Sequence, residues 1–224
     1  MEKEEIVNQP TREEVKQEML NYLQQKYGEE FESQYIEYKS WAQKGHEVML
    51  AFPKKGSEED VFVVNRYQNG KKYEDGYIGL LMKPTYKGLI EDSLASFFKE
   101  SKIVLNYKYV YPEAFDKETD FETFKRYANR KNNFVVSIYV PVDRSFSSEQ
   151  LEKSFEKIKE ELKKEISICS LTISCYLEED YRKDVLEYVL EHPEKSSFPT
   201  SNRLFSKYDS WGKIDFDYEY EEGD

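Results

Sequence analysis

The chain has 224 residues and a formal net charge of -12 at pH 7, with 38% hydrophobic and 35% charged residues. This acidic balance argues against nucleic-acid partners, which need a basic surface, and no run of about 18 apolar residues offers a transmembrane helix. The 19 tyrosines and 14 phenylalanines supply apolar area for a folded core, which argues against a disordered chain.

The N-terminal segment is expected to be a short flexible lead-in followed by a helix. Residues 1–10 are polar and contain no apolar stretch typical of a signal peptide. This start fits either a cytosolic protein or a chain whose export signal has been removed. Thr11 and Glu14 have the spacing of a capping box, in which each side chain bonds the other residue's backbone amide. With Gly28 as a C-terminal cap, the pattern predicts a helix from Arg12 to Tyr27.

Four strand-like runs follow, and the economical interpretation is one helix packed across an antiparallel meander. Asn69 and Gly70 form the strongest short hairpin signal, because both residue types tolerate positive φ. A second turn is predicted at residues 53–57, which contain proline and glycine. The predicted strands are Phe31–Ser40, Glu47–Phe52, Asp60–Tyr67 and Tyr73–Leu80.

The second half of the chain alternates strands with helices, which predicts a small α/β layer. A helix over Pro84–Lys99 precedes this layer and starts with a proline, which a first helical turn tolerates. Ser147 and Gln150 form another capping box, ahead of an apolar stripe with helical spacing. The predicted strands are Lys102–Val110, Asn133–Val140, which Pro141 ends, and Ile166–Tyr176; the predicted helices are 118–130, Ser147–Glu165 and Glu178–Glu191.

These elements predict an α+β protein with two domains. The first domain, over residues 11–100, would hold the N-terminal helix and the antiparallel sheet. The second, over residues 101–192, would hold the α/β layer. Residues 193–224 would form a loop, over 193–210, and then an acidic C-terminal strand.

That last strand, Ile214–Glu221, alternates apolar and acidic residues without exception. Its outer face would carry Asp215, Asp217, Glu219 and Glu221. We interpret this face as a solvated surface, with a partner-binding edge and a cation site as the alternatives. The carboxylates lack the loop glycine and the spacing of an EF-hand, and they would lie along an extended strand instead of converging.

No residue pattern indicates a catalytic, cofactor or metal site. The chain contains no nucleophile elbow and no glycine-rich phosphate-binding motif. His46 and His192 each lack a cysteine or a second histidine at metal-ligand spacing. Cys169 and Cys175 would sit about 20 Å apart on one strand, too far for a disulfide. We therefore expect no enzymatic activity, no cofactor and no metal.

The tyrosine-rich first half offers a candidate binding surface. In the predicted meander, Tyr35, Tyr38 and Trp41 lie near Tyr73 and Tyr77. Many of these rings can belong to the core. Those left exposed would form a surface of the kind enriched at protein interfaces. Together with the four acidic residues of the C-terminal strand, these five aromatic residues are the predicted partner-binding set.

Two motifs carry a resemblance to a known group of proteins. The run YLQQKYGEEFE and the hairpin exit D-G-Y-x-G-x-L, at Asp75–Leu80, resemble small cystatin-like proteins of low-GC Gram-positive bacteria, many of them lipoproteins. The similar stretch covers roughly residues 18–90. In that group a helix precedes a curved antiparallel sheet, so the resemblance implies a cystatin-like first domain. It also implies an exported, surface-tethered protein with no known enzymatic role. The chain lacks a lipobox cysteine, so a lipid anchor would lie outside it.

The combined prediction is a non-enzymatic accessory protein on the outer face of a Gram-positive membrane. It would hold a protein partner, of basic character, through sheet edges, aromatic residues and the acidic C-terminal strand. Immunity to a secreted toxin is one concrete version. The alternative is a cytosolic immunity or antitoxin-like partner protein, which the polar N-terminus and the unpaired cysteines favour. An enzyme that uses two carboxylates in a cystatin-like cone is a third class.

Overall fold

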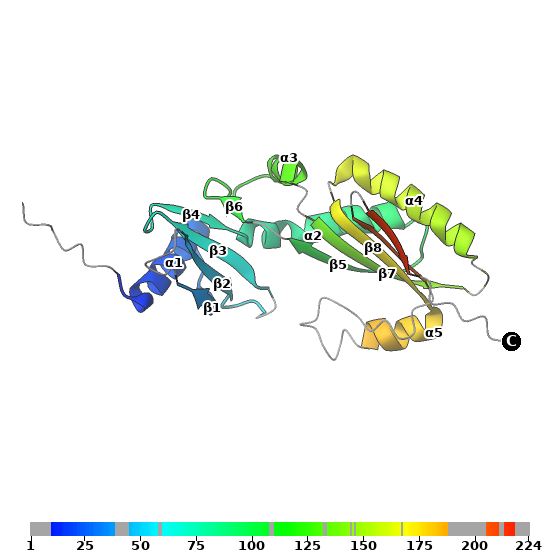
Figure 1. The fold of residues 1–224 in the computed structure, drawn as a ribbon, viewed down its shortest axis with the longest axis horizontal. Helices are drawn as coiled ribbons and strands as arrows, with labels where there is room; N and C mark the ends of the chain where they lie inside the picture. Colours follow the sequence, from blue (N-terminus) through cyan, green and yellow to red (C-terminus); the bar gives the residue numbers. More distant parts are fainter. Residues whose placement is uncertain are drawn as a thin grey trace, which may run out of the picture. The chain divides into compact units, whose positions relative to one another are not determined.

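The protein has an α+β fold that divides into two compact units (Figure 1). One unit contains residues 1–80 and 109–118, and the other contains residues 81–108 and 119–224. The predicted boundary near residue 100 falls inside the second unit. The computed structural model describes residues 10–38, 45–57, 60–107, 110–131, 134–143, 145, 147–166, 168–187, 205–210 and 213–217. The predicted lead-in therefore lies almost wholly outside the described residues.

Helix α1 runs from Arg12 to Tyr27 and confirms the predicted bounds. The capping box is formed as expected, because the Thr11 amide donates to Glu14 Oε2 at 2.7 Å and the Glu14 amide donates to Thr11 Oγ1 at 3.2 Å. Gly28 ends the helix with a φ of 75°, and its amide donates to the Gln24 carbonyl at 2.8 Å. The side of α1 that faces the sheet buries Val15, Met19, Tyr22, Leu23 and Tyr27.

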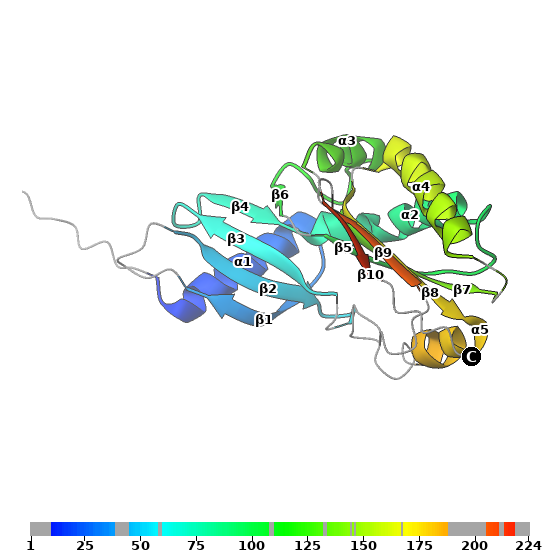
Figure 2. The same cartoon turned by 45° about the vertical axis from the view of Figure 1, so that its right-hand side comes forward.

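The first unit contains an antiparallel five-stranded sheet with the order β1-β2-β3-β4-β6, and α1 lies across one face of it (Figure 2). The predicted hairpin between β3 and β4 is confirmed, with positive φ at Gln68, Asn69 and Gly70. The strands are β1 (Phe31–Glu37), β2 (Glu47–Pro53), β3 (Phe62–Tyr67), β4 (Lys72–Asp75) and β6 (Tyr111–Pro112). Residues 39 and 40 of the predicted first strand lie outside the described residues.

Strand register assigns the side chains to the two faces of this sheet. Met49, opposite Val64, and Ala51, opposite Phe62, are buried beneath α1. A bulge between Ser33 and Tyr35 resets the register of β1. As a result, Tyr35 lies opposite Leu50 on the face away from α1, while Ile36 lies opposite Met49 and packs on the core.

The predicted strand Tyr73–Leu80 is wrong beyond Asp75. Helix α2 runs from Tyr77 to Leu94, so the predicted helix Pro84–Lys99 starts seven residues too late and ends too late. The helix starts at this point because Asp75 Oδ1 accepts the Tyr77 amide at 3.0 Å, which satisfies one of the first free amides of α2. Pro84 consequently lies inside the helix. It has no amide hydrogen to donate to the Leu80 carbonyl one turn earlier.

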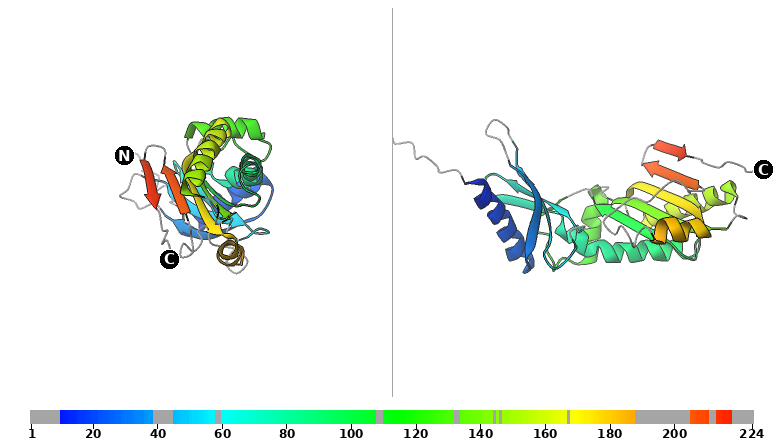
Figure 3. Two further views of the ribbon diagram at one scale, coloured as in Figure 1. Left: turned by 90° about the vertical axis from the view of Figure 1, so that its right-hand side faces the viewer. Right: turned by 90° about the horizontal axis from the view of Figure 1, so that it is seen from below.

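The second unit contains a mixed five-stranded sheet with the order β10-β9-β8-β7-β5 (Figure 3). Strands β7 and β8 are parallel and are joined by α4, whereas the remaining pairs are antiparallel. The strands are β5 (Lys102–Tyr107), β7 (Phe134–Val142), β8 (Ile168–Leu177), β9 (Phe205–Ser210) and β10 (Lys213–Asp217); the helices are α3 (Phe121–Lys131), α4 (Ser148–Glu165), α5 (Glu178–Asp180) and the π-helix η1 (Tyr181–Glu187).

Helices pack against both faces of the second sheet, to different extents. Tyr86 of α2 packs on Phe134 with ring centroids 4.5 Å apart, and α2 and α4 lie on the same side of the sheet (Figures 2 and 3). The alternate residues of β7, which include Tyr139, point to the opposite face of the sheet. There Tyr139 clusters with Tyr176 of β8 and with Tyr181 of η1. The β7 residues on the helix side are all buried, whereas on the opposite side Tyr139 is buried and Val135, Ser137 and Pro141 are partly exposed.

Several predicted elements of this unit need correction. The strand that Pro141 was expected to end continues to Val142, and Pro141 lies beyond the last β5 pair, where no amide is needed on that side. Strand β9 occupies the last part of the predicted loop 193–210. It was not predicted because its sequence FSKYDS has no alternation of apolar and polar residues. The predicted helix from Glu178 turns into a π-helix at Tyr181. Residues 188–204 and 218–224 lie outside the described residues.

Two glycine substitutions should have opposite effects on stability. Gly28→Ala puts a side chain on a left-handed residue and should lower the free energy of unfolding by about 1 kcal/mol. Gly88→Ala, inside α2 with nothing within 4 Å of the added carbon, should raise it by about 0.5–1 kcal/mol. Equilibrium unfolding in urea measures both. Equal signs for the two variants would contradict the assigned backbone conformations.

Candidate functional site

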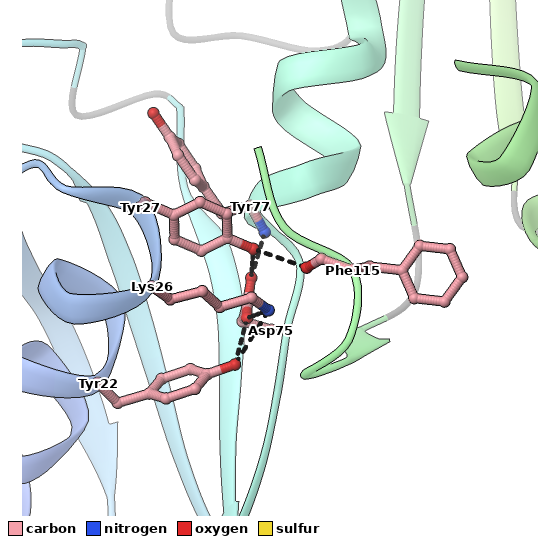
Figure 4. A network of polar contacts seen from close by, with 6 residues as sticks. All are labelled: Tyr22, Lys26, Tyr27, Asp75, Tyr77 and Phe115. Carbon is pink, nitrogen blue, oxygen red and sulfur yellow. Dashed lines mark hydrogen bonds and ion pairs between the residues drawn. The ribbon is translucent and has the colours of Figure 1, made fainter. Parts of the chain in front are cut away.

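A buried carboxylate lies between α1 and the junction of β4 with α2 (Figure 4). Asp75 has no exposed surface, and each of its two carboxylate oxygens accepts two hydrogen bonds. Oδ2 accepts from the Tyr22 hydroxyl and from Lys26 Nζ, each at 2.7 Å. Oδ1 accepts from the Tyr27 hydroxyl at 2.7 Å and from the Tyr77 amide at 3.0 Å. Four donors therefore saturate the carboxylate and balance the cost of its burial.

Lys26 supplies the positive charge of this network. Its side chain is only 7% exposed, and Nζ also donates to the Tyr22 hydroxyl at 3.1 Å. The ammonium lies 5.5 Å from the Tyr22 ring centroid and 5.0 Å from that of Tyr27, which adds cation–π attraction. Removing one member of a buried pair is destabilising, because it leaves the other charge without a counter-charge.

A second ionic cluster lies on the side of α1 that also carries Tyr22 and Lys26. Arg66 of β3 is 2% exposed and donates to Glu18 through Nε at 2.9 Å and through Nη2 at 2.5 Å. Its Nη1 donates to Glu47 of β2 at 3.2 Å. The Tyr73 ring stacks on Tyr22 at 4.3 Å, with an angle of 12° between the ring planes. This stack connects the arginine cluster with the Asp75 network.

The chemistry of the Asp75 network is that of a structural connection. Burial, and then the charge of Asp75, raise the pKa of the Tyr22 hydroxyl far above its usual value. The same two causes raise the pKa of Tyr27. Both hydroxyls therefore stay protonated and keep donating at neutral pH. All four hydrogen bonds that the carboxylate accepts come from groups within the first unit.

Sequence reasoning missed this network, although two signals were available. Glu18, Tyr22 and Lys26 recur every fourth residue, which places them in one row along α1. Arg66 follows the apolar run at the start of β3, and a charge on a buried face needs partners. Neither signal identifies Asp75, which the sequence presents only as part of a hairpin motif.

The structure separates the five predicted aromatic residues. Tyr77 is buried and donates its hydroxyl to Glu29 at 2.5 Å, and Tyr73 is half-buried in its stack with Tyr22. Tyr38 is partly buried, with the Arg12 guanidinium 5.3 Å from its ring centroid. Tyr35, in contrast, is 57% exposed. Trp41 lies outside the described residues.

The predicted acidic residues are only partly described. Asp215 and Asp217 lie on β10, opposite Tyr208 and Ser206 of β9. Glu219 and Glu221 lie outside the described residues, as does His192. Cys175 is a free, buried thiol on β8, and burial raises its pKa to about 12, so it is a poor nucleophile at neutral pH.

The face of the first sheet away from α1 is the second candidate site, and we call it the open face. It carries Tyr35 together with the partly exposed Val48, Leu50, Val63 and Tyr67. Within the described part of the first unit, no helix covers it (Figure 2). Tyr67 lies beside His46, with ring centroids 4.5 Å apart. The open face thus combines apolar and aromatic side chains with acidic ones, among them Glu32 and Glu37 of β1.

The described residues offer neither a metal centre nor a membrane span. No group of three or more His, Cys, Asp or Glu side chains in the described ranges is placed to hold a metal ion. Among the helices described, none combines the length and the apolar character needed to cross a membrane.

No protein-family model matches the chain, and no curated protein matches it. Among solved structures, the chain is similar to the crystal structure of a DUF5037 family protein from Ruminococcus gnavus ATCC 29149. The two chains are 16% identical, the match covers 91% of this chain and 95% of that chain, and the TM-score is 0.44. A likeness at this level supports no inference about function.

Asp75→Asn should be strongly destabilising, by about 3–5 kcal/mol, because it leaves the Lys26 ammonium buried without its counter-charge. Lys26→Met should cost less, about 1–3 kcal/mol, since three neutral donors still satisfy Asp75. The double variant should lose less free energy of unfolding than the sum of the losses of the two single variants. Urea unfolding measures the cycle, with the neighbouring Glu74→Gln as control. Strict additivity would contradict a coupled pair.

The raised tyrosine pKa values predict a loss of stability at alkaline pH. Above about pH 10 the unfolded chain releases phenolic protons that Tyr22 and Tyr27 retain in the folded state. The unfolded state then binds fewer protons, so stability falls as pH rises, by about 1.4 kcal/mol per pH unit for each tyrosine. Unfolding free energies between about pH 9 and pH 11 measure the slope. A Tyr22→Phe/Tyr27→Phe variant should show a smaller slope, and an unchanged slope would refute the assignment.

Proposed function

We propose that this chain is a non-enzymatic accessory protein of the bacterial cell surface that binds another protein through the first sheet. The observation that carries the proposal is Tyr35, a large aromatic side chain on strand β1 that is 57% exposed. A tyrosine ring combines a large contact area with few rotatable bonds, which is why tyrosine is enriched at protein interfaces.

Three further features support a protein partner. The open face around Tyr35 carries partly exposed apolar side chains, which gain free energy when another surface covers them. The buried charged groups Asp75, Arg66 and Glu47 are engaged in the Asp75 and Arg66 networks, which suits a scaffold better than a reactive site. The net charge of -12 favours a basic partner.

Immunity to a secreted toxin is the specific version of this function that we propose. The resemblance of roughly residues 18–90 to cystatin-like lipoproteins of Gram-positive bacteria supports this version. The same resemblance supports a location at the cell surface. The alternative is a cytosolic immunity or antitoxin-like partner protein. Fractionation of the native host decides between them, because a lipid-anchored protein partitions with membranes and into detergent. Recovery in the cytosol would favour the alternative.

A partner isolated from the native host tests the proposal. The protein that co-purifies with the full chain is identified, produced in pure form and measured by calorimetry. Tyr35→Ala should weaken its binding by about tenfold or more, because a central aromatic side chain carries much of the interface energy. Leu81→Ala, at a residue 40% exposed on α2, is the matched control and should have little effect.

The same binding experiment also tests the C-terminal strand, through a variant from which that strand is deleted. A chain that lacks residues 209–224 loses seven acids and one base, a change of +6 in formal charge. If the acidic strand steers a basic partner, the deletion should slow association and reduce its salt dependence. Failure to recover any partner with either chain would count against a binding function.

A further inference from the structure

Strand β1 lies at one edge of the first sheet (Figure 2). Among the described residues, its only strand partner is β2. The other side of β1 therefore presents backbone N–H and C=O groups to which a further strand could bond. Proteins commonly protect such an edge with lysine or proline, and β1 contains neither.

The side chains of β1 carry negative charge around one aromatic ring. Glu32, Tyr35 and Glu37 face the open side of the sheet, opposite Phe52, Leu50 and Val48, and all three are exposed. The strand contains no basic residue. The nearby Lys54 is paired with Glu30 at 2.9 Å and also attracts Glu32, whereas among the described residues no cation forms an ion pair with Glu37.

We propose that β1 binds an extended segment of the partner that is rich in arginine or lysine, and that this segment adds to the sheet as a further strand. The proposal rests on the proposed function and names the chemistry of its partner. Backbone hydrogen bonds supply the pairing, as in other complexes formed by strand addition. Cationic side chains of the added strand lie beside Glu32 and Glu37, and a guanidinium or an aliphatic chain covers the Tyr35 ring.

The bulge of β1 limits the length of this pairing. The register shifts between Ser33 and Tyr35, which divides the free edge into two short runs. A short pairing gives modest affinity, so specificity depends on the alternate side chains. The three side chains on the open side select a basic strand over an acidic one.

Synthetic peptides of the same length as β1 test the proposal with the full chain. The probe alternates arginine and valine, the first control replaces arginine by glutamate, and the second carries N-methylated amides that cannot pair. Backbone amide shifts in nuclear magnetic resonance spectra report the site. The arginine peptide should shift the amides of Phe31–Glu37, and both controls should bind at least about tenfold more weakly. Absence of binding, or shifts confined to other elements, would overturn the proposal.

A charge-reversed variant supplies the matched comparison. Glu32→Lys/Glu37→Lys should weaken the arginine peptide by about tenfold and strengthen the glutamate peptide. Glu91→Lys/Asp92→Lys makes the same change in charge at two exposed residues of α2 and should leave both affinities nearly unchanged. Equal effects of the two variants would mean that peptide binding depends only on the net charge of the protein. That result would refute binding at the edge of β1. If the native partner binds without depending on Glu32 and Glu37, the edge proposal fails while the binding function stands.

Discussion

A single buried carboxylate determines the architecture of the first unit. Asp75 has four donors, three from side chains of α1 and one from the first amide of α2. It thereby joins the helix to the sheet and ends β4 where α2 begins. A buried charge is costly unless all its hydrogen-bonding capacity is used. The positions of Tyr22, Lys26 and Tyr27 are therefore constrained together, and the stack of Tyr22 on Tyr73 extends the constraint to the Arg66 cluster.

In this arrangement the two faces of the first sheet have different roles. The face beneath α1 holds the ionic networks and the apolar core, so its polar groups are committed to folding. The open face and the edge of β1 carry the exposed Tyr35, Glu32 and Glu37. Because Tyr35 and Glu37 lie on the face away from the core beneath α1, they are available for recognition. The proposed partner binding depends on this separation.

Local signals were sufficient for much of the fold. The capping box at Thr11, the left-handed Gly28 and the Asn69–Gly70 turn predicted α1 and the β3–β4 hairpin, because each depends on residues close in sequence. The change from strand to helix at Asp75 could not be predicted in this way, since its donors on α1 lie about fifty residues earlier. Strand β9 was missed because its pairing with β8, not its own pattern, makes it a strand. Of the candidate site, the sequence identified Tyr35 but could not separate it from the buried Tyr77.

Hydrogen exchange at the first amides of α2 tests the central role of Asp75 most directly. The Tyr77 amide bonds the carboxylate, and the Gly79 amide bonds the Gly76 carbonyl at 3.0 Å. Both amides should be protected in the natural chain and in Lys26→Met, which retains the carboxylate. In Asp75→Asn they should exchange much faster, while amides of α4 in the second unit keep their protection. Undiminished protection of Tyr77 and Gly79 in Asp75→Asn would contradict the account, because α2 would then begin without the carboxylate.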